Sequence, residues 1–159
     1  MELTFRIEKK GEVDHIFLSG KINEDAEVAL GHILGSISSS VVFNFAGVKM
    51  INSCGVRAWI NFIREAQKSR EIAFRECTPE IVGQINMIPN FAGNAKIESV
   101  YADYACTKCS NSKWRIFTQG VDLPTSTSDL KLSLMKCDKC GAPMEMEEIE
   151  EEFFGFVEH

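Results

Sequence analysis

The stretch V-V-F-N-F-A-G-V-K-M-I-N-S-C-G-V-R-A-W-I, residues 41–60, decides the fold. Its first five residues are almost all apolar, as in a central strand that is covered on both faces. A short turn is expected next, after which apolar residues recur at helical spacing at Val56, Trp59, Ile60, Ile63 and Ala66. The sequence therefore predicts a buried strand that leads into an amphipathic helix, with N-S-C-G (52–55) at the junction.

An antiparallel pair of strands is predicted before this stretch. L-T-F-R-I-E (3–8) alternates in strand fashion, and H-I-F-L-S-G (15–20) follows the turn around Gly11. Asn23 is then a suitable N-cap for a helix whose apolar residues recur at helical spacing up to Ile37. We therefore expect two strands and a helix before the central strand.

A strand, a helix and a last strand are predicted after it. E-I-A-F-R-E-C (71–77) alternates as a strand, and Thr78-Pro79 is typical of the start of a helix, which Pro89 ends. A-K-I-E-S-V-Y (95–101) is the last predicted strand. The order is β-β-α-β-α-β-α-β. Strands joined through helices pair in parallel, so the opening hairpin makes the predicted sheet mixed.

Length and composition suit a compact protein. With 159 residues and 45% hydrophobic content, the chain can bury one full core beside a small annex. Its start lacks the pattern of a signal peptide, and no apolar segment approaches the roughly 18 residues of a membrane span, so we expect a cytoplasmic protein. In that compartment the six cysteines indicate metal binding or redox chemistry rather than disulfides.

The charge is unevenly distributed along the chain. The net charge is −2 over residues 1–103, +3 over 104–144 and −7 over 145–159. A non-specific nucleic-acid binder carries a clear basic excess, so the bulk of this chain argues against that role. The same segments form the expected division into a first domain, a cysteine-bearing segment and an acidic, aromatic tail.

The N-S-C-G turn places a hydroxyl and a thiol side by side where a helix begins. The backbone N–H groups around Ser53, Cys54 and Gly55 lack partners within the helix and lie at the positive end of its dipole. Such a position favours a capping oxygen, a bound or covalent phosphate, or an ionised thiol.

The first two thirds of the chain resembles the STAS domain, which is shared by bacterial anti-sigma factor antagonists and the cytoplasmic ends of sulphate transporters. The resemblance covers residues 1–103 and rests on the element order, on H-I-F-L-S-G-K-I (15–22) and on residues 41–60. In that family the junction turn commonly reads Asp-Ser-Ser/Thr-Gly, and a partner anti-sigma factor kinase phosphorylates its third residue. The unphosphorylated form binds that partner, whereas the phosphorylated form does not.

In this sequence Asn52 takes the Asp position, Ser53 the first Ser, Cys54 the phosphoacceptor and Gly55 the Gly. The resemblance therefore implies a partner-binding, regulatory surface at these four residues, no catalytic residues, and an anti-sigma factor or related kinase as partner. The acceptor hydroxyl, however, is replaced by a thiol. Four interpretations stay open: a Ser53 cap with a packed Cys54, docking without phosphorylation, phosphorylation of Ser53, and redox sensing by Cys54.

Two C-x-x-C pairs, Cys106 with Cys109 and Cys137 with Cys140, are separated by 27 residues. Two residues between thiolates let one tight turn present both sulfurs to a metal, and a second such turn completes a tetrahedral site. Four thiolates indicate one structural zinc ion. A rubredoxin-type iron site is the main alternative metal centre, and disulfides are the alternative without metal.

The segment around these pairs, residues 104–144, resembles a zinc ribbon. W-R-I-F-T (114–118) and K-L-S-L (131–134) are short alternating runs typical of strands. So small a fold buries little apolar surface, and metal binding then supplies much of its folding energy. Zinc ribbons often contact nucleic acid or the transcription machinery, and such contact is the alternative function here. The cations available for it are Lys108, Lys113, Arg115, Lys131, Lys136 and Lys139.

The acidic tail, residues 145–159, is typical of a solvated chain end, although Phe153, Phe154 and Phe156 also suit docking on a partner or a second subunit. The whole sequence thus predicts an α/β STAS-type domain followed by a small β-rich zinc ribbon. We expect a non-enzymatic regulatory interaction module without membrane contact. An enzyme with Cys54 as nucleophile is a further alternative, but no activating His is evident in the sequence.

Overall fold

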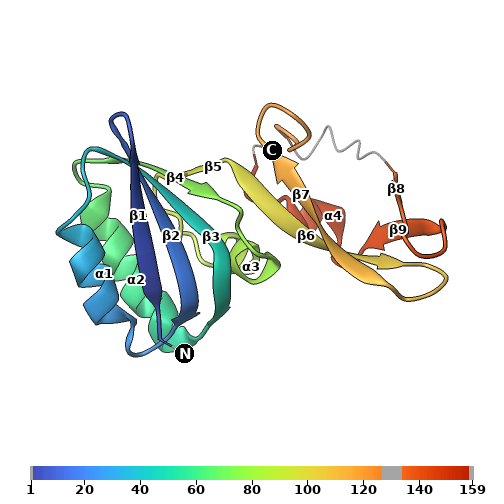
Figure 1. The fold of residues 1–159 in the computed structure, drawn as a ribbon, viewed down its shortest axis with the longest axis horizontal. Coiled ribbons are helices and arrows are strands. Elements are labelled where there is room, and N and C mark those ends of the chain that lie inside the picture. Colours follow the sequence, from blue (N-terminus) through green and yellow to red (C-terminus); the bar gives the residue numbers. More distant parts are fainter. Residues whose placement is uncertain (1, 127–133, 158–159) are drawn as a thin grey trace.

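The computed structural model describes residues 2–126 and 134–157, which form two β-sheets (Figure 1). The first sheet has the strand order β1-β2-β3-β4-β5, and the second has the order β7-β6-β9-β8. The strands of the first sheet are β1 (Thr4–Lys10), β2 (Val13–Ile22), β3 (Ser40–Ile51), β4 (Glu71–Arg75) and β5 (Lys96–Ile97). Those of the second are β6 (Ser99–Cys106), β7 (Ser112–Thr118), β8 (Met135–Lys136) and β9 (Pro143–Met146).

The first sheet is mixed, as predicted. β1 pairs with β2 in antiparallel fashion, whereas β2, β3, β4 and β5 pair with one another in parallel. Helices separate the parallel strands, so the predicted order β-β-α-β-α-β-α-β is confirmed through β5. The second sheet is antiparallel throughout its described pairs.

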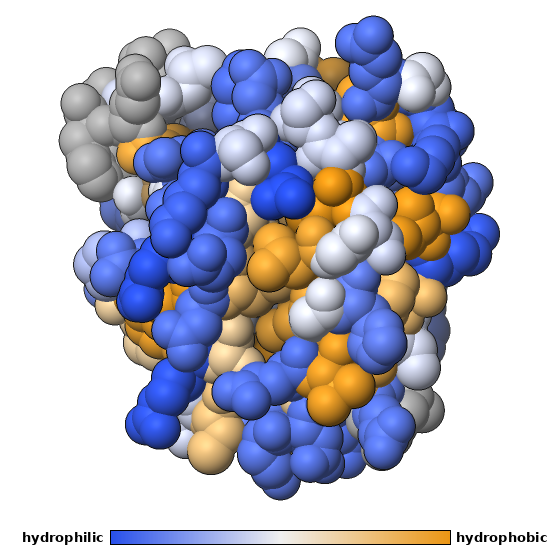
Figure 2. All heavy atoms as spheres, turned by 90° about the vertical axis from the view of Figure 1, so that its left-hand side faces the viewer, coloured by the Kyte–Doolittle hydropathy of each residue, from blue (hydrophilic) through white to orange (hydrophobic). Residues whose placement is uncertain are grey.

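The helices lie on one side of the first sheet and between the two sheets. α1 (Ala26–Leu34) and α2 (Ser53–Ala66) lie next to each other against the first sheet, while α3 (Pro79–Met87) lies between the sheets (Figure 1). α4 (Glu150–Phe153) packs beside α3 and the second sheet. On the face that carries α1 and α2, hydrophilic side chains surround separate apolar patches (Figure 2). No helix in residues 2–126 and 134–157 has the length and apolar character needed to cross a membrane.

Trp59 of α2 is the centre of the main core. It is fully buried, and its ring centroid lies 5.3 to 5.9 Å from those of Phe43, Phe45, Phe74 and Phe91. Its indole Nε1 donates a hydrogen bond to the Phe91 carbonyl at 3.0 Å, so the polar atom of the ring is satisfied. Because these rings come from β3, β4 and the loop after α3, they fix α2 on the sheet.

Two local predictions in the first domain were wrong. β3 does not turn after Phe45 but continues to Ile51, because irregular pairing with β2 carries the strand past Gly47. Asn23 is not the N-cap of α1, which begins at Ala26 after Asp25. The Asn23 Oδ1 instead accepts a hydrogen bond from the Asp25 backbone N–H at 3.0 Å, which makes a local turn before the helix.

The predicted last strand is divided between the two sheets. β5 pairs with β4, whereas β6 begins at Ser99 and belongs to the second sheet. Glu98, between them, forms an ion pair with Arg75 at 2.6 Å. The division of the chain at 103/104 and 144/145 stays a prediction, and β6 runs across its first boundary. Residues 131–133 of the predicted K-L-S-L strand lie outside the described residues.

The glutamates of the tail are exposed, as in a solvated end, but its phenylalanines pack against the rest of the chain. Phe153 and Phe154 are buried, and the Phe154 ring lies 5.2 Å from that of Phe117 on β7. The Asn86 side-chain amide of α3 donates hydrogen bonds to the carbonyls of Glu152 and Phe153, at 3.2 and 2.9 Å. The tail phenylalanines therefore dock within the chain itself and join α3 to the second sheet.

Candidate regulatory turn and metal centre

Asn52 is the N-cap of α2. Its Oδ1 accepts a hydrogen bond from the Gly55 backbone N–H at 2.8 Å, and its carbonyl accepts one from the Val56 N–H at 2.8 Å. Ser53 is the first helical residue rather than the cap. The interpretation of Ser53 as the cap was therefore wrong, and its hydroxyl is left available on the surface.

Glu24 supports the turn from the loop after β2. Its carboxylate accepts a hydrogen bond from Asn52 Nδ2 at 2.9 Å, and this bond lowers the pKa of Glu24. A negative charge therefore lies beside the turn although Asn replaces the Asp that the resemblance leads one to expect. Sequence reasoning missed Glu24, since nothing in the sequence indicates which side chain of the preceding loop reaches position 52.

Gly55 allows the turn to pack closely against the end of β2. It is buried, and a Cβ added to it would overlap the carbonyl oxygen of Ile22 at the end of β2. The Ile22 carbonyl also accepts a hydrogen bond from the Asn52 N–H at 3.2 Å. Only glycine permits this approach, so the turn is pressed against β2.

Ser53 and Cys54 are both exposed on the first turn of α2. No hydrogen bond between described residues involves either side chain or either backbone N–H. The interpretation of Cys54 as a packed apolar side chain was therefore wrong. Cys77, by contrast, is fully buried, and burial raises the pKa of its thiol, so it packs as an inert apolar residue.

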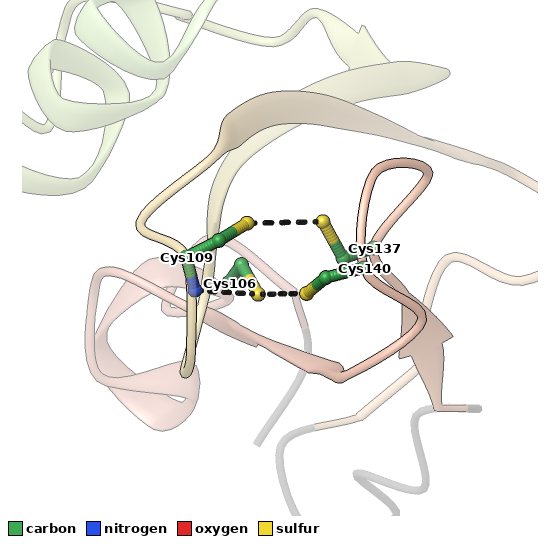
Figure 3. A group of neighbouring side chains, drawn as sticks. All are labelled: Cys106, Cys109, Cys137 and Cys140. Atoms are coloured by element: carbon green, nitrogen blue, oxygen red, sulfur yellow. Dashed lines mark hydrogen bonds between the residues drawn. The ribbon is translucent and has the colours of Figure 1, made fainter.

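The four remaining cysteines come from two turns of the second sheet, one between β6 and β7 and the other between β8 and β9. Their sulfurs all lie within 4.8 Å of one another, with Cys106 Sγ 3.4 Å from Cys140 Sγ and Cys109 Sγ 3.6 Å from Cys137 Sγ (Figure 3). A tetrahedral site with Zn–S bonds of about 2.3 Å has sulfurs about 3.8 Å apart. The four thiols therefore fit one tetrahedral metal ion.

Backbone N–H groups prepare the first cysteine of each pair as a thiolate. The N–H groups of Cys109 and Lys108 donate to Cys106 Sγ, both at 3.4 Å, and lower its pKa. Hydrogen bonds from the backbone of Cys140 and Lys139 likewise lower the pKa of Cys137 to about 6. Such donors also orient ligands around a metal.

The two C-x-x-C turns end in the same way. Ser110 follows the first pair with φ of 62°, and Gly141 follows the second with φ of 74°. The left-handed residue turns the chain back after the second cysteine of each pair, which explains why the second motif reads C-x-x-C-G. The matched turns, four thiols and N–H···S bonds support a metal site, and thiolate ligands fit zinc or iron.

The cations of the ribbon differ in their surroundings. Lys113 forms an ion pair with Asp138 at 3.0 Å, and the Arg115 guanidinium lies 4.6 Å from the centre of the Phe117 ring. Lys108 and Lys139 are exposed at the tips of the two C-x-x-C turns. Lys136 is exposed as well, whereas Lys131 lies outside the described residues.

A second polar cluster, which sequence reasoning missed, joins the two sheets. Glu76 follows β4 with a left-handed φ of 49°, and its carboxylate accepts hydrogen bonds from the Asn44 side chain and from the Tyr101 hydroxyl, the latter at 2.6 Å. This hydrogen bond raises the pKa of Tyr101 to about 12. The unusual φ of Glu76 has no local sequence signal, because its partners come from distant strands.

Comparisons with known proteins give partial structural likenesses. No protein-family model and no curated protein sequence matches the chain. An anti-sigma factor antagonist from Mycobacterium paratuberculosis is similar at a TM-score of 0.47 and 17% identity, over 55% of this chain and 79% of that one. The unphosphorylated form of the anti-sigma factor antagonist SpoIIAA is similar at a TM-score of 0.36 and 19% identity, over 45% of this chain and 72% of that one. Mglu is similar at a TM-score of 0.40 and 23% identity, over 43% of this chain and 18% of that one.

Each likeness has a TM-score below 0.5, so none of them assigns a function to this chain. The mixed sheet and the order β-β-α-β-α-β-α-β, however, are those that the sequence resemblance implies. The first part of the chain has a STAS-type fold. In this STAS-type domain the N-S-C-G turn lies at the carboxyl end of β3, and the β-rich part that carries the four clustered cysteines continues directly from β5.

Proposed function

We propose that this protein is a non-enzymatic regulatory module of the cytoplasm that docks a partner protein through Asn52, Ser53, Cys54 and Gly55. The exposure of Ser53 and Cys54 on a turn held by buried Gly55 and by Asn52 carries this proposal. A preorganised surface loses little conformational entropy on binding. The resemblance to anti-sigma factor antagonists supports an anti-sigma factor or related kinase as the partner.

Phosphorylation of Ser53 is a distinct possibility within this proposal. A phosphate there would lie beside the free N–H groups of the first turn of α2, which favour an anion. It would also lie near the carboxylate of Glu24, which opposes it. Docking without phosphorylation therefore stays our first interpretation, and Cys54 supplies a small, neutral contact at the position of the family's phosphoacceptor.

We further propose that the four cysteines hold one structural zinc ion, with all four coordination positions taken by Cys106, Cys109, Cys137 and Cys140. Zinc has no redox chemistry and leaves no open position in such a site. Its contribution is to fix the two C-x-x-C turns against each other. Among the described residues of the ribbon, the alternative function, an adaptor for nucleic acid, is supported by the exposed lysines Lys108, Lys136 and Lys139.

Affinity capture with the full-length, zinc-loaded protein tests the docking surface. Cys54→Glu should remove a partner that the unchanged protein retains from lysate of its source cells, because a bulky charge would occupy the surface. Ser39→Glu, an exposed substitution before β3, is the matched control and should retain it. Equal recovery with both variants would refute docking at the turn, and mass spectrometry of Ser53 would reveal phosphate.

A further inference from the structure

The outer face of the second sheet carries an exposed apolar patch. Trp114 and Ile116 on β7 are 47% and 41% exposed. Tyr101 on β6 pairs with Ile116, and its ring centroid lies 5.3 Å from that of Trp114. We call this surface the Trp114 face. Exposed aromatic residues that lie next to one another are typical of protein interfaces.

Carboxylates border the Trp114 face. Asp103 lies opposite Trp114 in the strand register, and the Glu147 backbone N–H donates to the Asp103 carbonyl at 2.8 Å. Burial, with the like charges of Asp103 and Glu147, raises the pKa of the adjacent Glu148. No ion pair between described residues involves any of these three acids. Their mutual repulsion would be relieved by a cation from outside.

The neighbouring cations of β7 lie on the other face of the sheet. Lys113 and Arg115 alternate with Trp114 and Ile116, and successive side chains of a strand point to opposite faces. There Lys113 pairs with Asp138, and Arg115 lies over the Phe117 ring. A nucleic-acid backbone on the Trp114 face would therefore be repelled by Asp103, Glu147 and Glu148. The charge favours a cationic protein segment.

We propose that the Trp114 face docks a segment of a partner protein that carries lysine or arginine beside apolar residues. The apolar side chains would cover Ile116, a cationic head would lie over the Trp114 ring, and the bordering carboxylates would pair with further cations. This surface is on the second sheet, separate from the N-S-C-G turn at the end of β3, so it can fail or hold independently of the proposed function.

Fluorescence offers a direct measurement, because the chain has two tryptophans and Trp59 is fully buried. Collisional quenching of the zinc-loaded, full-length protein should therefore report Trp114. With each ion's quenching normalised to that of free N-acetyltryptophanamide, we expect caesium to quench Trp114 at least about twofold more effectively than iodide, because the bordering carboxylates concentrate cations and repel anions. In the triple variant Asp103→Asn, Glu147→Gln, Glu148→Gln, the preference for caesium should disappear.

Binding is tested with a labelled peptide of alternating lysine and leucine, against a matched glutamate-leucine peptide and oligothymidylate. The lysine-leucine peptide should bind best, and both the triple variant and Trp114→Ala should weaken it about tenfold or more. The control triple variant Glu2→Gln, Glu12→Gln, Glu27→Gln makes the same charge change at exposed sites of the first domain and should bind normally. Circular dichroism and zinc content verify that each variant is folded.

Three outcomes would overturn the proposal. They are equal loss of binding in the two triple variants, preferential binding of oligothymidylate, and no binding of the lysine-leucine peptide at millimolar concentration. The first would show that net charge, rather than the Trp114 face, determines peptide binding. The second would identify the Trp114 face as a nucleic-acid-binding surface.

Discussion

The side-chain amide of Asn52 connects Glu24 to Gly55. It donates to the Glu24 carboxylate through Nδ2 at 2.9 Å and accepts from the Gly55 N–H through Oδ1 at 2.8 Å. An aspartate at position 52 would keep the cap but would face the carboxylate of Glu24. Asn52 and Glu24 therefore form a matched pair, in which the negative charge beside the turn comes from the preceding loop.

Substitutions of Asn52 should separate its two hydrogen bonds. Asn52→Ala removes the cap and should lower the free energy of unfolding by about 1 kcal/mol. Asn52→Asp should destabilise the protein at neutral pH, and adding Glu24→Gln should restore stability because the repulsion is removed. Urea unfolding measures all three. If Glu24→Gln does not rescue Asn52→Asp, the two side chains are not coupled.

Gly55→Ala should disrupt the turn, because its Cβ would overlap the Ile22 carbonyl. Relief requires a backbone shift, so we expect a loss of about 2 to 3 kcal/mol in the free energy of unfolding. Gly31→Ala on α1 is the control, since a Cβ there has nothing within 4 Å. It should stabilise the helix by about 0.5 to 1 kcal/mol. Similar effects of the two substitutions would contradict the close contact.

Asp14 should make stability depend on pH. It is buried, and burial opposes its charge, but hydrogen bonds from the Ser38 N–H and hydroxyl, at 2.7 and 2.9 Å, and the charge of Lys9 outweigh this and lower its pKa. The stability that the charge of Asp14 gives the folded protein is therefore fully present above the pKa of an unfolded aspartate, about 3.9. It is lost as the pH falls through the lower pKa of Asp14 in the folded state.

Asp14→Asn should consequently cost about 1.5 to 3 kcal/mol at pH 7 and progressively less below pH 4. Thermal unfolding between pH 2 and pH 7 measures this difference. A gap between the two proteins that stays constant over the whole range would show that the charge of Asp14 is not the stabilising feature.

Metal removal should unfold the second sheet before the first. We expect one zinc ion per chain by native mass spectrometry, and a strong chelator or Cys137→Ser should abolish it. The emission of Trp114 should then change, while that of buried Trp59 stays. A coloured protein that contains iron would show that the metal is iron rather than zinc. A second sheet that stays folded without metal would refute a structural role for the metal ion.

The tail should be part of the folding unit. Phe154 is fully buried against Phe117, so Phe154→Ala should cost about 3 to 5 kcal/mol. Ile149→Ala, at a 60% exposed position just before α4, is the control and should change stability by less than about 0.5 kcal/mol. Urea unfolding compares the two, and equal effects would mean that the tail does not stabilise the chain.

Periodic segments made most of the first domain predictable from sequence. Trp59 and Ile63 mark the buried face of α2, and Thr78 with Pro79 marks the start of α3, where the Thr78 hydroxyl accepts from the Ile81 N–H at 3.4 Å. The cysteine spacing similarly predicted the convergence of four thiols, because two short turns leave few other arrangements.

Positions decided by distant contacts were not predictable. Asn52 and Ser53 are equally good N-caps, and the packing of Gly55 on Ile22 selects Asn52. The alternation in residues 95–101 suits either sheet, so nothing local indicates the change of sheet at Glu98. The tail has the composition of a solvated end, and only the contacts of Phe154 with Phe117 reveal that it packs.

β6 joins the first domain to the cysteine cluster as one strand. The Cys77 N–H donates to the Ser99 carbonyl at 3.1 Å and the Tyr101 N–H donates to the Cys77 carbonyl at 2.8 Å, while the strand ends at Cys106. A break anywhere within residues 99–106 would thus separate the cysteine cluster from the first domain. The two parts are therefore mechanically continuous, and a chimera that exchanged one of them would have to keep β6 whole.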